Sequence, residues 1–191
     1  AVYINNVVND ASEWGQNASI STIYGGAIYA KNGDDVLFSG NGYVSLNNIG
    51  SRSSHGTNYS YKDFFGYGGA VHAEDLFIKG TKSAVDILKC YILQGVCTDE
   101  EGEGKGGAVY AHHLQISDNG GNVNLGENYI HTANNSQGGA LYITQSGEIN
   151  NNGLHVQING NYVESAPDKK YGLWEDSLDA DCYAYGGAVF V

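Results

Sequence analysis

Two short segments concentrate carboxylates of the kind that bind metal ions. The acidic clusters are Asp99, Glu100, Glu101 and Glu103, and Glu175, Asp176, Asp179 and Asp181. Such oxygen-rich clusters hold calcium when their spacing is right, but neither matches a helix–loop–helix calcium loop or a glycine-rich calcium repeat. We therefore interpret both clusters as solvated charge runs and predict no metal site.

The histidines invite a metal or catalytic interpretation as well. They are His55, His72, His112, His113, His131 and His155. Adjacent residues on a strand point to opposite faces, so His112 and His113 are not expected to share one metal ion. The sequence contains no nucleophile elbow, phosphate-binding loop or zinc motif. We predict no catalytic residue and no cofactor.

The three cysteines, Cys90, Cys97 and Cys182, match neither a zinc site nor a disulfide framework. Cys90 and Cys97 are close enough in sequence to close a small loop through a disulfide. They are equally well interpreted as two separate, reduced thiols. Cys182 is then an odd thiol or a cross-link to a neighbouring chain, and the sequence leaves these pairings open.

Composition excludes several classes of partner. The formal charge of −12 arises from 21 acidic residues against 9 basic ones, and Arg52 is the only arginine. Phosphate binding needs clustered Lys and Arg, so neither nucleic acid nor an anionic membrane surface is an expected partner. The chain lacks the run of about 18 apolar residues that a membrane-spanning helix needs, so no direct membrane insertion is predicted. The absence of methionine suggests an excised or processed segment.

A glycine-rich motif recurs along the chain and points to the elements that position these residues. Each copy reads Gly-Gly-Ala, then an aliphatic residue, then an aromatic ring or histidine. The five full copies begin at Gly25, Gly68, Gly106, Gly138 and Gly186. We interpret Ala1-Val2-Tyr3-Ile4 as a sixth copy without its glycines. The chain then begins and ends within the motif, and we expect it to continue into further repeats of a parent protein.

A second motif, an apolar residue, two others and then asparagine, lies between the glycine-rich copies. It occurs at Phe38–Asn41, Ile116–Asn119, Leu125–Asn128 and Ile158–Asn161. Asparagine tolerates the left-handed conformation and bonds neighbouring backbone, so these positions suit corners of the chain. Stacked asparagines also bond one another as ladders. We expect a structural role for them.

The spacing of apolar residues predicts the fold. Between Ala108 and Ala140, alternation indicates three short strands, at residues 108–111, 114–117 and 123–125, and no stretch carries a helical period. Three strands per repeat predict an all-β, right-handed, three-sided parallel β-helix of about five to six rungs. Residues 1–191 would form a single segment of this solenoid. Stacking would align the aliphatic residues inward and the rings in an outer aromatic column.

The motifs resemble those of a known family. Repeated Gly-Gly-Ala-(Ile/Val/Leu) with Phe-x-x-Asn is the signature of autotransporter passenger domains of the chlamydial polymorphic membrane protein type. The first half matches at five full sites and one truncated site, whereas Phe-x-x-Asn matches strictly only at Phe38–Asn41. The resemblance implies a passenger β-helix, displayed on the bacterial surface or shed from it, that acts in adhesion.

Four insertions interrupt the repeats, near residues 9–19, 50–67, 94–105 and 163–185. Because equivalent positions in stacked repeats lie over one another, the insertions should gather along one edge. Their aromatic residues either pack back on the scaffold or form a recognition surface, as aromatic loops on rigid scaffolds do. The residues expected to bind a ligand are Trp14, Tyr59, Tyr61, Phe64, Phe65, Tyr171 and Trp174.

The leading functional hypothesis is a surface-exposed or secreted, adhesin-type domain. Its partner would be a host-cell or extracellular protein or glycan, and its location would be extracellular or on the bacterial surface. The first alternative is a polysaccharide lyase or glycoside hydrolase, which needs paired carboxylates, or calcium with a base, on one strand face. Here the acids lie in loops and not in register on strands. The second alternative is a structural stalk or spacer.

Overall fold

The alternating apolar residues form short parallel strands that are shared among three sheets. The computed structural model describes residues 1–10, 20–30, 34–40, 42–53, 63–94, 102–132, 135–153, 155–165 and 183–191. Within these residues all regular secondary structure is β-strand. The prediction of an all-β protein built from parallel strands is confirmed.

Each sheet takes strands from successive segments of the chain. Sheet A contains β1 (Val2–Asp10), β5 (Val44–Ser53), β8 (Val85–Leu88), β9 (Tyr91–Gln94), β12 (Val123–Gly126), β13 (Tyr129–Thr132), β16 (Val156–Asn159) and β17 (Tyr162–Ser165). Sheet B contains β2 (Ile20–Tyr24), β6 (Asp63–Tyr67), β10 (Gly102–Lys105), β14 (Asn135–Gln137) and β18 (Tyr183–Tyr185). Sheet C contains β3 (Ile28–Tyr29), β4 (Val36–Ser39), β7 (Val71–Lys79), β11 (Val109–Ser117), β15 (Leu141–Asn150) and β19 (Val189–Phe190).

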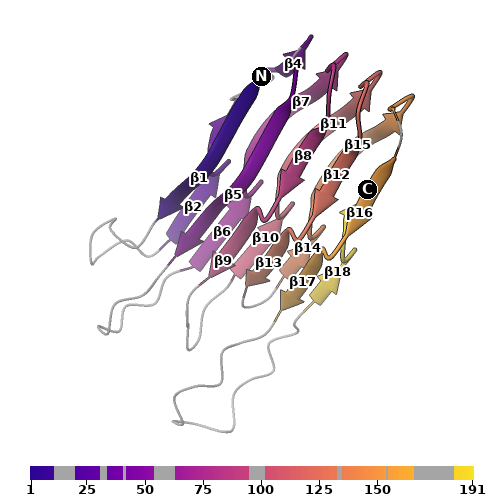
Figure 1. Ribbon diagram of the computed structural model, residues 1–191. Helices are drawn as coiled ribbons and strands as arrows, with labels where there is room; N and C mark the ends of the chain where they lie inside the picture. The colour runs from indigo at the N-terminus through magenta and orange to yellow at the C-terminus, as the bar shows by residue number, and fades with distance from the viewer. Residues whose placement is uncertain are drawn as a thin grey trace, which may run out of the picture.

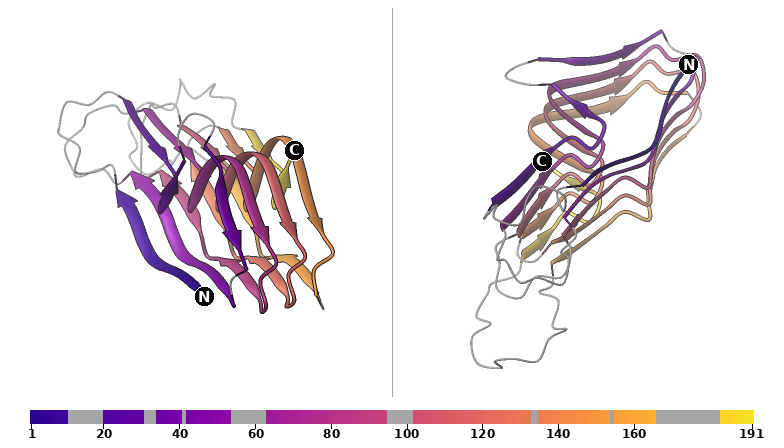
Figure 2. Two further views of the ribbon diagram at one scale, coloured as in Figure 1. Left: turned by 90° about the horizontal axis from the view of Figure 1, so that it is seen from above. Right: turned by 90° about the vertical axis from the view of Figure 1, so that its left-hand side faces the viewer.

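The chain visits the three sheets in a fixed order, A then B then C, and each passage makes one repeat. In sheet B, for example, the strands follow one another as β2, β6, β10, β14 and β18, and each neighbouring pair is parallel. Figure 1 shows the strands in chain order along the molecule, and Figure 2 shows the same succession from two other sides. Residues far apart in the sequence therefore lie side by side at equivalent positions of neighbouring repeats.

Aliphatic residues at equivalent positions form the core. Val71 pairs with Ile28 on one side and with Val109 on the other, and Leu141 follows Val109 in the same column. Val71, Val109 and Leu141 are buried, as the prediction of an inward aliphatic column requires. A second cluster, made of Ile23, Phe64, Ile92 and Ile130, joins sheet B to the end of sheet A.

The N-terminal segment does not occupy the position that its sequence indicates. Val2 pairs with Val44 and Ile4 with Leu46, so β1 is the counterpart of β5 in sheet A. The interpretation of residues 1–4 as a truncated Gly-Gly-Ala copy is wrong. Alternation of apolar residues is common to strands of all three sheets, and only the glycines distinguish the corner strand.

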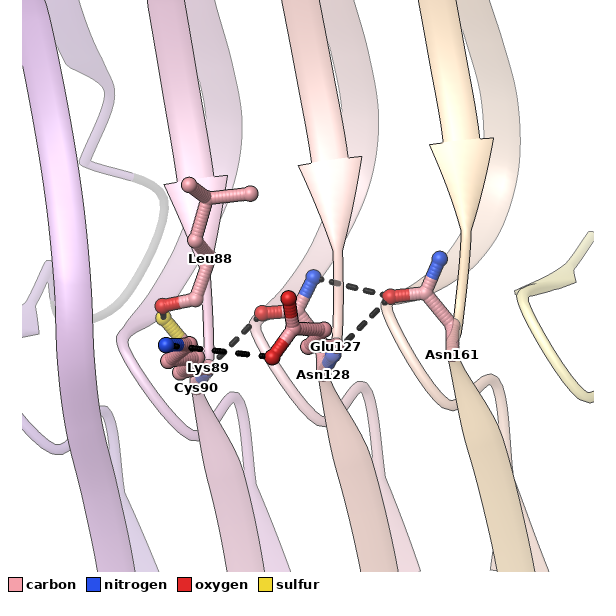
Figure 3. Close-up of polar contacts among 6 residues, drawn as sticks. All are labelled: Leu88, Lys89, Cys90, Glu127, Asn128 and Asn161. Atoms are coloured by element: carbon pink, nitrogen blue, oxygen red, sulfur yellow. Dashed lines mark hydrogen bonds and ion pairs between the residues drawn. The ribbon is translucent and has the colours of Figure 1, made fainter.

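Asparagines link neighbouring repeats at two corners. At the corner shown in Figure 3, the Asn128 side chain accepts a hydrogen bond from the Cys90 backbone N–H (2.9 Å) and donates one to the Ile87 carbonyl (3.0 Å). Asn161 does the same for the Asn128 N–H (3.0 Å) and the Leu125 carbonyl (2.8 Å). The Asn128 side chain also donates to that of Asn161 (3.0 Å), which makes a ladder. The expected structural role of these asparagines is confirmed.

The residue before each ladder position has the left-handed backbone conformation. In this column φ is positive at Asn48, Lys89, Glu127 and Gly160. The left-handed residue precedes Asn128 and Asn161 in two repeats and Ile49 and Cys90 in the two earlier ones, so the ladder asparagine is not itself left-handed. At Glu127 the left-handed backbone costs free energy, because the residue is not glycine, and the hydrogen bonds of Asn128 that follow offset that cost.

Cys90 occupies the asparagine position of its own repeat. Its thiol is buried and lies 3.7 Å from the Leu46 carbonyl oxygen, which is the acceptor that an asparagine would reach. Cys90 is a free cysteine, so the pairing with Cys97 considered from the sequence is not formed by Cys90 in this structure. The side chain points into the core because it continues the ladder column. Cys97 lies outside the described residues.

Candidate binding surface

The Gly-Gly-Ala corner fixes where the next side chains point. Gly68 has φ of +70°, and a Cβ atom there would lie 1.9 Å from the Val71 carbonyl oxygen. A Cβ atom on Gly69 would lie 1.9 Å from the Gly107 carbonyl oxygen of the neighbouring repeat. The first glycine therefore makes the tight turn, and the second allows the repeats to approach closely. This corner joins sheet B to sheet C.

An aromatic column follows the corner on the outer surface, as predicted. We name it the corner column; its members are Tyr29, His72, Tyr110, Tyr142 and Phe190. The rings of His72 and Tyr110 stack at 4.7 Å with an interplanar angle of 3°, and those of Tyr142 and Phe190 at 5.0 Å and 1°. Tyr3 is not a member, because it pairs with Ser45 of sheet A.

Sheet B contributes a second line of side chains directly before the corner. Tyr24, Tyr67 and Lys105 are in register there. The centroid of the Tyr24 ring lies 5.1 Å from that of Tyr29 and 4.9 Å from that of His72. The side chains of sheet B therefore contact the corner column across the corner. The sequence analysis missed this line. Its signal was the residue immediately before each glycine pair, which is tyrosine in three copies.

Lys105 places a positive charge beside the rings of sheet B and the corner column. Its Nζ atom lies 2.8 Å from the Glu103 carboxylate, 5.7 Å from the Tyr67 ring and 5.5 Å from the Tyr142 ring. The Tyr67 hydroxyl donates a hydrogen bond to Glu103 (2.9 Å), and burial together with this bond raises the pKa of Tyr67. These contacts hold the rings and the ion pair in one arrangement.

His72 is neutral within the corner column at physiological pH. Burial, together with the nearby His112, lowers the pKa of His72 to about 4. Its Nδ1 atom is buried and has no hydrogen-bond partner among the described residues. A neutral imidazole stacks as an aromatic ring, so the column is continuous through its histidine.

The insertions start and end at stacked residues beside this surface. They leave sheet A after Asp10, Ser53, Gln94 and Ser165, all at the same end of its strands; Asp10 pairs with Arg52, and Ser53 with Gln94. They return to sheet B, where Ile20 pairs with Asp63 and Phe64 with Gly102. We name this line of stacked strand ends the insertion edge. The outer face of sheet B lies between the insertion edge and the corner column.

The structure separates two adjacent residues that were predicted to bind together. Phe64 lies in β6 and is fully buried against Ile23, Ile92 and Ile130, so its prediction as an exposed loop aromatic is wrong. Phe65 points the other way and is partly exposed on sheet B, in register with Glu103. The remaining predicted ligand-binding residues lie outside the described residues; they are Trp14, Tyr59, Tyr61, Tyr171 and Trp174.

Histidine–carboxylate pairs connect neighbouring repeats on the outer faces. His112 Nδ1 lies 2.5 Å from Glu74, and His131 Nδ1 lies 3.1 Å from Glu164. His113 Nδ1 lies 2.6 Å from the Ser146 hydroxyl at an exposed position. Asp75 pairs in register with His113, but its Oδ1 atom has no hydrogen-bond partner in the described part of the chain, so no acid–histidine–serine relay is formed.

No cluster of three or more metal-ligating side chains occurs among the described residues. Within the same residues we find no helix with the length and apolar character needed to cross a bilayer. Comparisons with protein-family models, curated proteins and solved structures found no match to this chain. The aromatic and charged residues of sheet B and the corner column therefore carry the functional argument.

Proposed function

We propose that this chain is a segment of a right-handed, three-sided parallel β-helix that acts as an adhesin-type binding domain. In this proposal the parent protein resembles an autotransporter passenger domain and is extracellular or displayed on a bacterial surface. The ligand is a host-cell or extracellular protein or glycan. It binds at the insertion edge and on the adjoining outer face of sheet B.

One observation carries the proposal: the insertion edge adjoins a pre-ordered, tyrosine-rich face. Asp10, Ser53 and Gln94 lie on neighbouring strands, so insertions that differ in length and sequence start from one line. Tyrosine supplies a large, rigid contact area at a low cost in side-chain entropy, and it is enriched at recognition surfaces. The rings of Tyr24 and Tyr67 stack at 5.3 Å, so little further ordering accompanies binding.

The experiment measures binding of the purified, labelled chain to cultured epithelial cells, with and without protease or glycosidase treatment of the cells. Three variants remove parts of the proposed surface: Trp174→Ala, Phe65→Ala, and deletion of residues 54–62. The deletion stays within 54–62 because Val44–Ser53 and Asp63–Tyr67 are strands. We expect saturable binding that weakens at least about tenfold in one or more variants, as for loss of an aromatic contact in an interface.

Leu37→Ala is the matched control. Leu37 is 59% exposed and belongs to β4 of sheet C, and its substitution removes apolar surface outside the proposed site. Circular dichroism and urea unfolding establish that each variant is folded. Unchanged binding in all three variants would support a stalk or spacer instead. Release of reducing or unsaturated sugar ends from a polysaccharide would support the enzyme alternative.

A further inference from the structure

Polar side chains interrupt the tyrosines on the outer face of sheet B. Directly before the corner, Tyr67 is followed in register by Lys105 and then by Gln137. At the other outward position, Glu103 is followed by Asn135. We name Glu103, Lys105, Asn135 and Gln137 the polar patch. Their strands, β10 and β14, are interior strands of sheet B with β6 and β18 on either side, so the ends of the stack do not produce the patch.

The corner column borders the polar patch with the edges of its rings. Lys105 Nζ lies 5.5 Å from the centroid of the Tyr142 ring. The Tyr110 ring is stacked between His72 (4.7 Å between centroids) and Tyr142 (5.3 Å), and the Tyr142 ring is stacked between Tyr110 and Phe190 (5.0 Å). Both faces of these two rings are therefore covered by other rings. What they offer a ligand is their edges and hydroxyl groups.

The hydrogen-bonding groups that remain free at this border are uncharged. Within the described residues, neither the hydroxyls of Tyr110 and Tyr142 nor the side-chain amide of Gln137 forms a hydrogen bond. All three side chains are half-buried, so a ligand that covers them has to supply hydrogen bonds in place of water. The charges of the patch are already paired, because Lys105 Nζ lies 2.8 Å from the Glu103 carboxylate.

Strand β14 begins without a long insertion before it. Residues 133 and 134 alone connect β13 to β14, and the Thr132 hydroxyl lies 2.9 Å from that of Ser136 in this short corner. The equivalent connections of the other repeats are residues 11–19, 54–62, 95–101 and 166–182. The polar patch thus lies where the line of insertions is interrupted.

From these features we infer that the polar patch and the bordering tyrosine hydroxyls form a subsite for a neutral glycan segment. A sugar ring carries several hydroxyl groups that donate and accept, so it can bond Gln137, Tyr110 and Tyr142 together. Neighbouring repeats are about 4.8 Å apart, close to the length of one sugar in an extended chain, so successive sugars lie over β10 and β14. The inference rests on the proposed binding function and specifies its ligand.

A protein partner and an anionic sugar fit this surface less well. Protein interfaces take most of their binding energy from a few side chains, often aromatic, that are buried in fully desolvated pockets. The polar patch has no apolar side chain, and the faces of the bordering rings are covered by other rings. An anionic sugar needs an unpaired cation, whereas Lys105 is paired with Glu103 in a chain whose formal net charge is −12.

The experiment applies the full chain to an array of neutral, sialylated and sulfated oligosaccharides. The affinity of the strongest neutral binder is then measured by isothermal titration calorimetry. Gln137→Ala and Tyr142→Phe each remove one proposed hydrogen-bonding group. Tyr129→Phe is the matched control, because the Tyr129 ring is stacked in the same way on sheet A, between Tyr91 (5.3 Å) and Tyr162 (5.2 Å). Urea unfolding establishes that each variant is folded.

We expect neutral oligosaccharides to bind, and each of Gln137→Ala and Tyr142→Phe to weaken that binding about two- to tenfold, as for loss of one hydrogen bond. Tyr129→Phe should bind as the native chain does. No binding to the array, a preference for sialylated or sulfated sugars, or equal effects of Tyr142→Phe and Tyr129→Phe would overturn the inference.

Binding to cells separates the glycan inference from the proposed adhesin function. Cell binding that is lost after protease treatment but survives periodate oxidation of the cell-surface sugars would overturn the inference and leave the adhesin function standing. A chain that binds neutral oligosaccharides with the expected response to Tyr142→Phe, but does not bind cells, would support the glycan subsite and refute cell adhesion.

Discussion

Replacing Asn128 with alanine tests whether the asparagine ladder stabilises the stack of repeats. The substitution removes the acceptor of the Cys90 N–H and the donor to the Ile87 carbonyl. It also removes the side-chain bond to Asn161 (3.0 Å). Asn128 is fully buried, so water does not replace these partners freely. We expect a lower free energy of unfolding and little change in the overall fold.

The loss in free energy of unfolding is set by the Cys90 N–H and the Ile87 carbonyl, the two backbone groups that lose their partner. A buried backbone group left without a partner costs about 1–3 kcal/mol, so the two groups together give a loss of about 2–6 kcal/mol. Asn128→Cys should cost less than Asn128→Ala, because a thiol at this position reaches a carbonyl oxygen in the way that Cys90 reaches Leu46. The order of stability, asparagine above cysteine above alanine, follows from the remaining hydrogen-bonding capacity.

Equilibrium urea unfolding measures these differences, provided that the urea dependence, m, stays constant between variants. Gln115→Ala is the matched control, since it removes an amide side chain that bonds Glu148 (3.3 Å) on an outer, exposed face. Its expected cost is below about 0.5 kcal/mol. The ladder argument is refuted if Asn128→Ala costs no more than Gln115→Ala.

Three further predictions concern other positions in the same scaffold. Cys90→Asn should raise the free energy of unfolding by about 1 kcal/mol, because an amide reaches the Leu46 carbonyl better than a thiol does. In the native protein, burial raises the pKa of Cys90 to about 12, so labelling of this thiol with iodoacetamide should require unfolding. Rapid labelling of the native protein would contradict the assigned burial. Burial lowers the pKa of His72 from 6.5 to about 4. On acidification, the unfolded chain therefore binds a proton at His72 at a higher pH than the folded protein does. The free energy of unfolding falls as the pH drops from 6.5 to about 4. After allowing for solvent screening, the free energy of unfolding falls by about 1–2 kcal/mol over this pH range. His72→Phe should remove this pH dependence. Identical profiles of stability against pH for the two proteins would exclude a contribution from His72. Phe64→Ala should cost about 3–5 kcal/mol in urea unfolding and Phe65→Ala about 1 kcal/mol or less, and similar costs would show that the two side chains do not differ in burial.

The repeated motifs predicted much of the local structure correctly. The Gly-Gly-Ala copies predict a corner, then an inward aliphatic residue and an outward ring, and Val109 and Tyr110 occupy these positions. The recurring asparagines predict backbone-bonding corners, and Asn119 and Asn128 form them. These predictions hold because each depends on a residue type with one dominant physical property: glycine's conformational freedom, or the asparagine amide's ability to donate and accept at once.

The candidate surface was predicted only in part. Tyr24 and Tyr29 are separated by the corner in sequence, yet their rings lie 5.1 Å apart, and Lys105 reaches the Tyr142 ring of the following repeat. Alternation did not assign Phe64 and Phe65 to different faces, because both residues are apolar and either could point inward. Phe64 is the residue that points inward, because it packs in one buried cluster with Ile92 of the neighbouring repeat.

By itself, the sequence determined that this protein is all-β, that it repeats, and which residues turn its corners. The tertiary structure alone decided that β1 pairs with β5, that Cys90 is a core residue in an asparagine column, and which tyrosines share a surface. The reason is physical. Residue type constrains local backbone and the alternation of faces, whereas the register between repeats determines which side chains become neighbours.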